Sequence, residues 1–121
     1  MTGSHMQRFQ DDNFESRVLK SPTPVLVDFG AVWCPPCRAM RPHVDAVAQA
    51  FAGKLTVGEL DVDENPVTSE RYRVRSLPTV MLFKNGVPVD MIVGAVTRSR
   101  LEELVRKHLD RGGDDQPSVQ R

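Results

Sequence analysis

The 121-residue sequence contains only two cysteines, and this scarcity limits what the protein can be. Disulfide-dense scaffolds need several cysteine pairs, and a structural zinc site needs about four protein ligands. An excess of one charge is also absent, because 16 Lys and Arg residues balance 16 Asp and Glu residues. Nucleic acids and anionic membranes demand a strong basic excess. The composition therefore argues against a disulfide-stapled scaffold and against nucleic acid or membrane as the partner.

Long hydrophobic runs are missing as well. The longest, such as Val80-Met81-Leu82-Phe83, have the length of a strand and fall short of the roughly 18–20 residues that cross a bilayer. The hydrophobic fraction of 40% and the charged fraction of 26% are typical of globular proteins. A chain of this length has room for one domain with a single core.

The two ends of the sequence differ from its centre. Residues 1–5 look like the remnant of an expression tag, and the N-terminus has neither the charged nor the apolar region of a signal peptide. We therefore expect a native start near Met6 and, if no export signal was removed, a cytoplasmic protein. Residues 111–121 are polar and aperiodic, which predicts a disordered C-terminal tail. The folded domain is expected over residues 6–110.

Hydrophobic periodicity and the turn residues between periodic segments predict alternating helices and strands. In chain order, we expect helix 12–21, strand 25–29, helix 35–53 with a kink at Pro42, strand 55–61, helix 65–72, strand 79–84, strand 88–93 and helix 98–109. Asn85-Gly86 predicts a hairpin, and the earlier alternation predicts parallel strands joined by helical crossovers. The predicted fold class is therefore α/β, with a mixed sheet and helices on both faces.

The two cysteines lie in Trp33-Cys34-Pro35-Pro36-Cys37, where a predicted strand meets a predicted helix. The helix dipole and the unpaired amides of a helix N-terminus favour an anion, so the thiol pKa of Cys34 is expected to fall. Cys37 lies on the same helical face and can attack a mixed disulfide formed at Cys34. Pro35 and Pro36 fit the first helical turn, but each removes an amide that could stabilise the thiolate.

Three other interpretations of the cysteine pair stay open. A metal site is one, although His43 and His108 have no spacing that completes a zinc site, and we expect His43 to be an exposed helix residue. A permanent structural disulfide is another, although closing so short a loop gains little stability. Two ordinary small core residues are the third. The position at a strand-to-helix junction favours redox chemistry over all three.

Several motifs occur in a fixed order along the chain. They are Val27-Asp28-Phe29, Trp33-Cys34-Pro35-Pro36-Cys37, Pro42, Ser76-Leu77-Pro78-Thr79, Phe83-Lys84-Asn85-Gly86 and Val93-Gly94-Ala95. Their order and spacing, between about Phe9 and Leu109, resemble those of the thioredoxin family. The resemblance implies the thioredoxin fold and a protein-disulfide oxidoreductase with no bound cofactor or metal, only a redox-active Cys34-Cys37 pair. The sequence also has no glycine-rich dinucleotide motif, so NADPH would bind a partner.

The resemblance also implies three catalytic residues. Cys34 would be the nucleophile, Cys37 the resolving thiol, and Asp28 a buried acid that accepts the proton of Cys37, through water. From the residues alone, an aspartate turned to solvent is the alternative, because Asp is seldom fully buried. Apolar neighbours on both sides of Asp28 favour burial, and desolvation would then raise its pKa.

A substrate-binding surface beside the cysteines is implied in the same way. It comprises Trp33, Pro36, Leu77, Pro78, Thr79, Gly94 and Ala95. Pro78 would follow a cis peptide bond, with an ordinary trans turn proline as the alternative. Trp33 would shield the disulfide unless it is a plain core aromatic. Gly94 would let a substrate backbone approach unless it only forms a bend.

Three residues depart from the family pattern. Pro35 replaces a glycine and should stiffen the active-site loop. Gly30 replaces a common second tryptophan, which should thin the wall behind the active site and leave Asp28 wetter. Glu59 replaces the lysine next to the buried acid, so we expect Asp28 and Glu59 to titrate together, with one proton held nearer neutral pH. The alternative is a Glu59 side chain turned to water.

The function we favour is a monomeric enzyme that reduces the disulfides of protein substrates through a mixed disulfide at Cys34. Its electron donor would be a thioredoxin reductase, either NADPH-dependent or ferredoxin-dependent. A thiol oxidant or disulfide isomerase on the same fold, and a binding subunit without turnover, are the alternatives. Arg71, Arg73 and Arg75 lie near Pro78 and form either a solvated surface or a basic rim that steers acidic partners.

Overall fold

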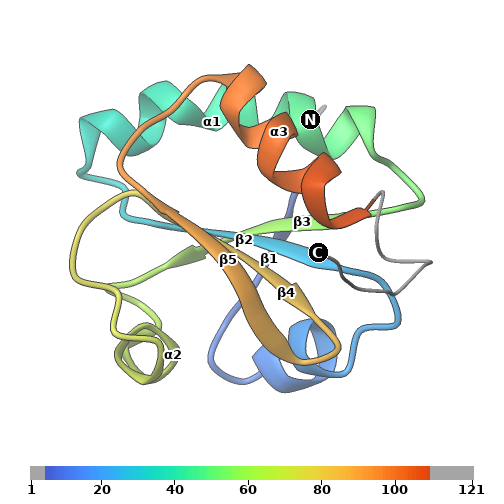
Figure 1. Cartoon of the computed structure of the whole chain (residues 1–121). Coiled ribbons are helices and arrows are strands. Elements are labelled where there is room, and N and C mark those ends of the chain that lie inside the picture. The colour runs from blue at the N-terminus through green and yellow to red at the C-terminus, as the bar shows by residue number, and fades with distance from the viewer. Residues whose placement is uncertain (1–4, 110–121) are drawn as a thin grey trace.

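The computed structural model describes residues 5–109, which form a five-stranded sheet and four helical segments (Figure 1). In chain order, the elements are β1 (Gln7–Arg8), η1 (Glu15–Leu19), β2 (Val25–Gly30), α1 (Pro35–Ala50), β3 (Thr56–Asp61), α2 (Pro66–Arg71), β4 (Thr79–Lys84), β5 (Val87–Val93) and α3 (Arg98–Leu109). The expected tag remnant, apart from its last residue, and the predicted C-terminal tail lie outside the described residues. No helix within residues 5–109 is long and apolar enough to cross a membrane.

The sheet is mixed, as the sequence predicts. Its strand order is β1-β3-β2-β4-β5, with parallel pairs on the β1 side of β2 and antiparallel pairs on the other side. The β4–β5 hairpin turns at Asn85 and Gly86, whose φ angles of 54° and 83° match the left-handed turn conformation that the Asn-Gly pair favours. The central position of β2 places the chain segment that follows it in the middle of one sheet edge.

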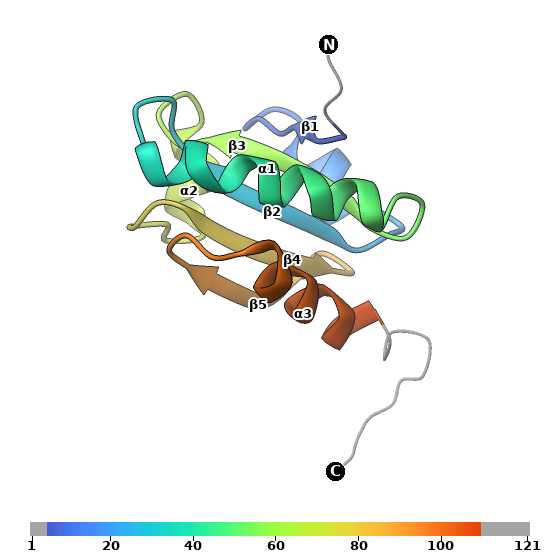
Figure 2. The same ribbon diagram turned by 90° about the horizontal axis from the view of Figure 1, so that it is seen from above.

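Helices cover both faces of the sheet, which confirms the predicted layers. Figure 2 shows α1 above β2 and β3 and α3 above β4 and β5, whereas η1 and α2 lie on the opposite face. The α1 side encloses a core with Leu26, Val44 and Leu104, and the η1 side encloses a second core with Phe29 and Phe83. Strand residues alternate between these cores because successive side chains of a strand point to opposite faces.

Helix α1 forms where the apolar periodicity predicts it. Met40, Val44, Val47 and Ala48 are buried on one face, and the helix continues through Pro42. It ends at Ala50, before the expected limit at Gly53, because Phe51 and the following residues form a turn in which Gly53 takes a φ angle of 87°.

The N-terminal segment differs from the sequence prediction. The expected helix over 12–21 is a short π-helical segment, Glu15–Leu19, preceded by a turn. No pattern in the sequence indicates β1, because Gln7 and Arg8 are both polar and show no apolar alternation. The strand pairs with β3, and the next residue, Phe9, is buried with no exposed surface.

Candidate active site

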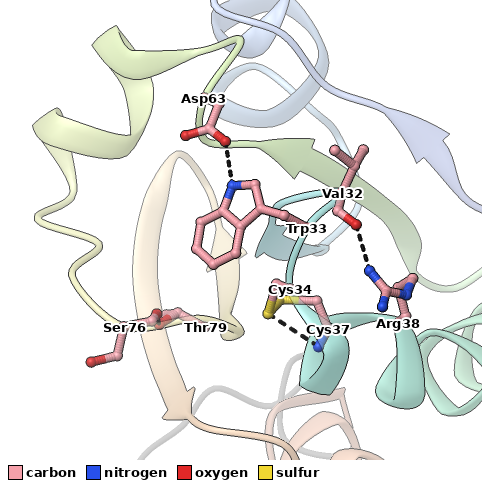
Figure 3. Close-up of a disulfide and its surroundings, with 8 residues drawn as sticks. All are labelled: Val32, Trp33, Cys34, Cys37, Arg38, Asp63, Ser76 and Thr79. Atoms are coloured by element: carbon pink, nitrogen blue, oxygen red, sulfur yellow. Dashed lines mark hydrogen bonds between the residues drawn. A yellow bond between two sulfur atoms is a disulfide. The ribbon is translucent and has the colours of Figure 1, made fainter.

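The two cysteines form a disulfide at the junction between β2 and α1 (Figure 3). Cys34 is the N-cap residue of α1, and its Sγ accepts a hydrogen bond of 3.3 Å from the backbone N–H of Cys37. Pro35 and Pro36 occupy the first helical turn, as expected from their fixed φ angle. The amide of Cys37 and the N-terminus of α1 are therefore directed at the sulfur of Cys34, an arrangement that favours a thiolate there.

The surroundings of the disulfide are partly closed. Cys34 and Cys37 are 3% and 8% exposed and pack with Ala31. In contrast, Trp33 is 62% exposed, and its Nε1 donates a hydrogen bond of 2.6 Å to Asp63. Trp33 is thus no core aromatic; its indole is fixed at the surface beside the cysteines.

The segment Ser76–Thr79 lies on the same side of the disulfide as Trp33 (Figure 3). Its Leu77–Pro78 peptide bond is cis, and the Thr79 hydroxyl donates a hydrogen bond of 2.6 Å to the Ser76 carbonyl. The amide of Gly94 donates a bond of 2.8 Å to the carbonyl of Pro78, which ties the end of β5 to this segment. Three stretches far apart in the sequence therefore meet around Cys34.

The remaining residues of the expected substrate surface differ in exposure. Pro36 and Ala95 are exposed, Leu77 and Gly94 are half-buried, and Pro78 and Thr79 are buried. Gly94 has a φ angle of 100°, and no atom lies within 4 Å of the position that a Cβ would take. The backbone at Gly94 is consequently open to an approaching chain.

Asp28 is buried in the centre of the sheet, as its apolar neighbours indicate. It is 5% exposed, and its Oδ1 has no hydrogen-bond partner within residues 5–109. The alternation along β2 directs Leu26, Asp28 and Gly30 toward the α1 layer. Burial, and secondly the negative charge of Glu59, raise the pKa of Asp28 from 3.8 to about 7, whereas the charge of Arg41 opposes the rise. A carboxyl group with this pKa can take or release a proton near neutral pH.

Glu59 faces a cation that the sequence analysis missed. It pairs with Asp28 in the register of β2 and β3, and Arg41 from α1 donates two hydrogen bonds, of 2.5 and 2.8 Å, to its carboxylate. The Glu59 side chain is 25% exposed, so it is neither turned fully to water nor buried alone. The sequence does place a basic residue, Arg41, on the helix that follows the cysteines. That Arg41 pairs with Glu59 is visible only in the tertiary structure.

A cavity of about 370 Å³ lies behind the disulfide, next to Gly30. Its walls include Asp28, Gly30, Cys37, Arg38, Arg41 and Glu59. A Cβ atom at position 30 would lie 3.3 Å from the Sγ of Cys37, closer than an ordinary contact, so glycine at this position lets the Cys37 side chain pack against the backbone. Asp28 nevertheless remains only 5% exposed beside this cavity.

The other polar residues considered from the sequence lie elsewhere. His43 is half-buried on α1 rather than exposed, and His108 shares a hydrogen bond of 2.9 Å with Asp90. Within residues 5–109, no group of three or more His, Cys, Asp or Glu residues could hold a metal ion. Arg71, Arg73 and Arg75 are all exposed on α2 and in the loop that leads to β4.

Comparison with known proteins agrees with this geometry, since a family model described as Thioredoxin matches residues 5–107. The chain belongs to the thioredoxin family. It is 50% identical over 99 residues to thioredoxin 1 of Nostoc sp., an alignment that covers 82% of this chain and 92% of the relative. The thioredoxin of Synechocystis sp. gives the same values, and the chloroplastic M-type thioredoxin of Pisum sativum is 43% identical over 106 residues, 88% of this chain and 62% of the relative.

Membership of the thioredoxin family fixes the fold and the general activity. The mixed sheet with its helices is the thioredoxin fold. The protein is a dithiol–disulfide oxidoreductase whose redox-active group is the Cys34-Cys37 disulfide. Its substrates contain disulfides, and a reductase returns its own disulfide to the dithiol.

Proposed function

We propose that Cys34 attacks the disulfide of a protein substrate and that Cys37 resolves the product. The thiolate of Cys34 forms a mixed disulfide with one substrate sulfur, and the other substrate sulfur leaves as a thiolate that takes up a proton. The thiolate of Cys37 then attacks Cys34, releasing the second substrate thiol. The substrate gains two electrons and the dithiol becomes the disulfide. The position of Cys34 at the N-cap of α1 carries this assignment.

Asp28 accepts the proton of Cys37 in this proposal, through water in the cavity that both residues line. Its pKa of about 7 suits the task, because a base that operates near neutral pH needs a pKa in that range. Its Oδ1 is buried and has no hydrogen-bond partner among the described residues, so no other group competes for a proton at this carboxyl group.

The substrate lies across the surface formed by Trp33, Pro36, Leu77, Pro78, Thr79, Gly94 and Ala95. An extended segment beside the cis peptide bond at Pro78 would place its disulfide over Cys34 and its backbone against Gly94, where no side chain intervenes. The exposed indole of Trp33 supplies apolar contact area at the rim.

The direction of the reaction is reduction of the substrate, and the electron donor is a thioredoxin reductase that uses NADPH or ferredoxin. The protein acts as a cytoplasmic monomer and binds no cofactor of its own. A coupled turnover assay with each purified reductase identifies the donor, and equilibration with glutathione followed by thiol trapping fixes the direction. A dithiol that persists in a mildly reducing buffer would identify an oxidant or isomerase instead.

The decisive test is insulin reduction by the parent protein, by Cys34→Ser and by Cys37→Ser. We expect both variants to lose turnover, and only Cys37→Ser to accumulate a mixed disulfide with the substrate, detected by mass spectrometry. Accumulation on Cys34→Ser would reverse the roles of the two sulfurs. A parent protein that binds partners but shows no dithiol-dependent turnover would be a binding subunit.

A further inference from the structure

The cavity next to Gly30 reaches the cysteine pair at Cys37 and shares no residue with the proposed substrate surface. Its walls come from β1, β2, β3, the start of α1 and the adjoining loops. Of the two cysteines, Cys37 lines the cavity and Cys34 does not; neither Trp33 nor Pro78 contributes. The space is thus separate from the surface on which a protein substrate is proposed to lie.

Two observations make this cavity chemically specific. Gly30 and Cys37 both line it, and a Cβ at position 30 would come within 3.3 Å of the Cys37 Sγ, so a larger side chain there would crowd this sulfur. The carboxyl group of Asp28, more than nine-tenths buried, also lines the cavity and has an Oδ1 without a partner. A thiol and a carboxyl group that can accept a proton therefore border the same small space.

The charges around the cavity favour a small, uncharged molecule as its ligand. Arg41 is paired with Glu59 through two hydrogen bonds, and Arg38 donates a bond of 2.6 Å to the carbonyl of Val32. Both of these cations are thus engaged. The remaining charged residues of the lining, Arg8, Asp61 and Glu64, include both signs, so the walls present no large excess of one charge. A volume of about 370 Å³ admits a molecule of a few heavy atoms but no folded polypeptide.

We propose that small uncharged hydroperoxides enter this cavity and oxidise Cys37 in the reduced protein, which gives the enzyme a second activity. The thiolate of Cys37 attacks the terminal oxygen, the O–O bond breaks, and the alkoxide or hydroxide leaves and takes up a proton. Cys37 becomes a sulfenic acid. Cys34 then attacks the sulfur of Cys37, and water leaves. The dithiol loses two electrons, and the hydroperoxide becomes an alcohol, or water when it is hydrogen peroxide.

This activity uses Asp28 as the proton acceptor of Cys37 and so rests on that part of the proposed function, but it does not require Cys34 to attack first. Protein disulfides would react at Cys34 on the substrate surface, and hydroperoxides at Cys37 in the cavity. The same reductase would restore the dithiol after either reaction.

The test follows the oxidation of Cys37 by hydrogen peroxide in Cys34→Ser, where sulfenic acid is trapped with dimedone and quantified by mass spectrometry. We expect Gly30→Trp, which fills the cavity, to slow this oxidation by about tenfold or more, since thiol oxidation depends on access. Gly30→Ala places only a methyl group against Cys37 and provides a second, smaller obstruction. Circular dichroism establishes that each variant is folded.

Comparing Cys34→Ser with Cys37→Ser distinguishes blocked access through the cavity from a general change in thiol reactivity. In Cys37→Ser, the oxidation of Cys34 should change less than about twofold when Gly30 is substituted, because Cys34 does not line the cavity. Equal slowing of both cysteines, or no slowing of Cys37 by either substitution, would overturn the proposal. Insulin reduction by the parent protein is measured separately and reports only on the proposed function.

Discussion

Asp28 is the residue whose position is hardest to explain by stability alone. A buried carboxyl oxygen without a hydrogen-bond partner costs free energy, and native proteins contain few of them. Strongly perturbed carboxyl groups that line a cavity next to a reactive group are typical of functional sites. The proton transfer that we propose between Cys37 and Asp28 would account for this cost.

Asp28 should make the folded protein less stable as the pH rises. Between its unfolded pKa of 3.8 and its folded pKa of about 7, the folded state holds a proton that the unfolded state has lost. Each pKa unit corresponds to about 1.4 kcal/mol, so the free energy of unfolding should fall by about 4 kcal/mol between pH 4 and pH 8 from this group alone.

Urea unfolding at several pH values measures this effect. The variant Asp28→Asn should lack the decline and exceed the parent protein in stability at pH 8. As a control, Asp12→Asn, which changes an exposed aspartate, should leave the slope intact. If the free energy of unfolding changes with pH to the same extent in the parent and in Asp28→Asn, the raised pKa of Asp28 is contradicted.

The charges of Glu59 and Arg41 should shift the titration of Asp28 in opposite directions. Glu59→Gln removes a negative charge and should lower the pKa of Asp28 below about 7, whereas Arg41→Gln removes the opposing cation and should raise it. NMR titration of the Asp28 carboxyl carbon in the oxidised protein measures both. If the titration of Asp28 is the same in all three proteins, the coupling between the two carboxyl groups is rejected.

At the scale of elements, β1 is the least obvious part of the fold. It contributes two exposed residues at the sheet edge, yet it positions Phe9 in the core of the η1 side. The ring of Phe9 lies over Gly58 in β3, and a Cβ at position 58 would overlap it. The close approach of this ring, rather than backbone conformation, explains the glycine in the middle of a strand.

Gly58→Ala should therefore destabilise the protein by about 1–3 kcal/mol, because the added methyl group overpacks the core. The ring of Phe9 must move, which should detach β1 from β3. Chemical unfolding measures the loss, and hydrogen exchange at the amide of Phe9, which donates to the Glu59 carbonyl, reports the detachment. Phe9→Leu combined with Gly58→Ala should recover part of the stability. Full stability of the single variant would contradict the predicted overlap.

At the scale of the whole molecule, overall neutrality conceals an uneven distribution of charge. The 16 basic and 16 acidic residues cancel, but Arg71, Arg73 and Arg75 gather in and beside the loop that leads to Pro78. All three are exposed. Charge clusters of this kind can accelerate association with partners of opposite sign.

Neutralising this cluster should slow the reduction of acidic substrates. We expect Arg71→Gln, Arg73→Asn and Arg75→Gln together to lower the association rate about tenfold at low salt and to flatten its salt dependence. Asn is chosen at position 73 because this residue has a φ angle of 57°. The control variant carries Arg17→Gln, Lys20→Gln and Lys54→Gln, three exposed cations in η1, just after it, and in the loop between α1 and β3. Stopped-flow kinetics that are independent of salt would exclude steering.

The sequence by itself determined the features that depend on local patterns. Apolar periodicity predicted α1 and α3, Asn85-Gly86 predicted the hairpin, and the Trp33–Cys37 motif predicted a redox pair at a helix N-terminus. Each of these signals lies within a few neighbouring residues, where backbone propensity and side-chain spacing act directly.

Only the tertiary structure decided how distant residues meet. Arg41 and Glu59 are 18 positions apart and interact because α1 packs over the register of β2 and β3. The edge strand β1 and the cavity beside Gly30 likewise arise from packing between separate elements. Burial and distance set the pKa of Asp28 and the access to Cys37, and neither quantity exists until the chain has folded.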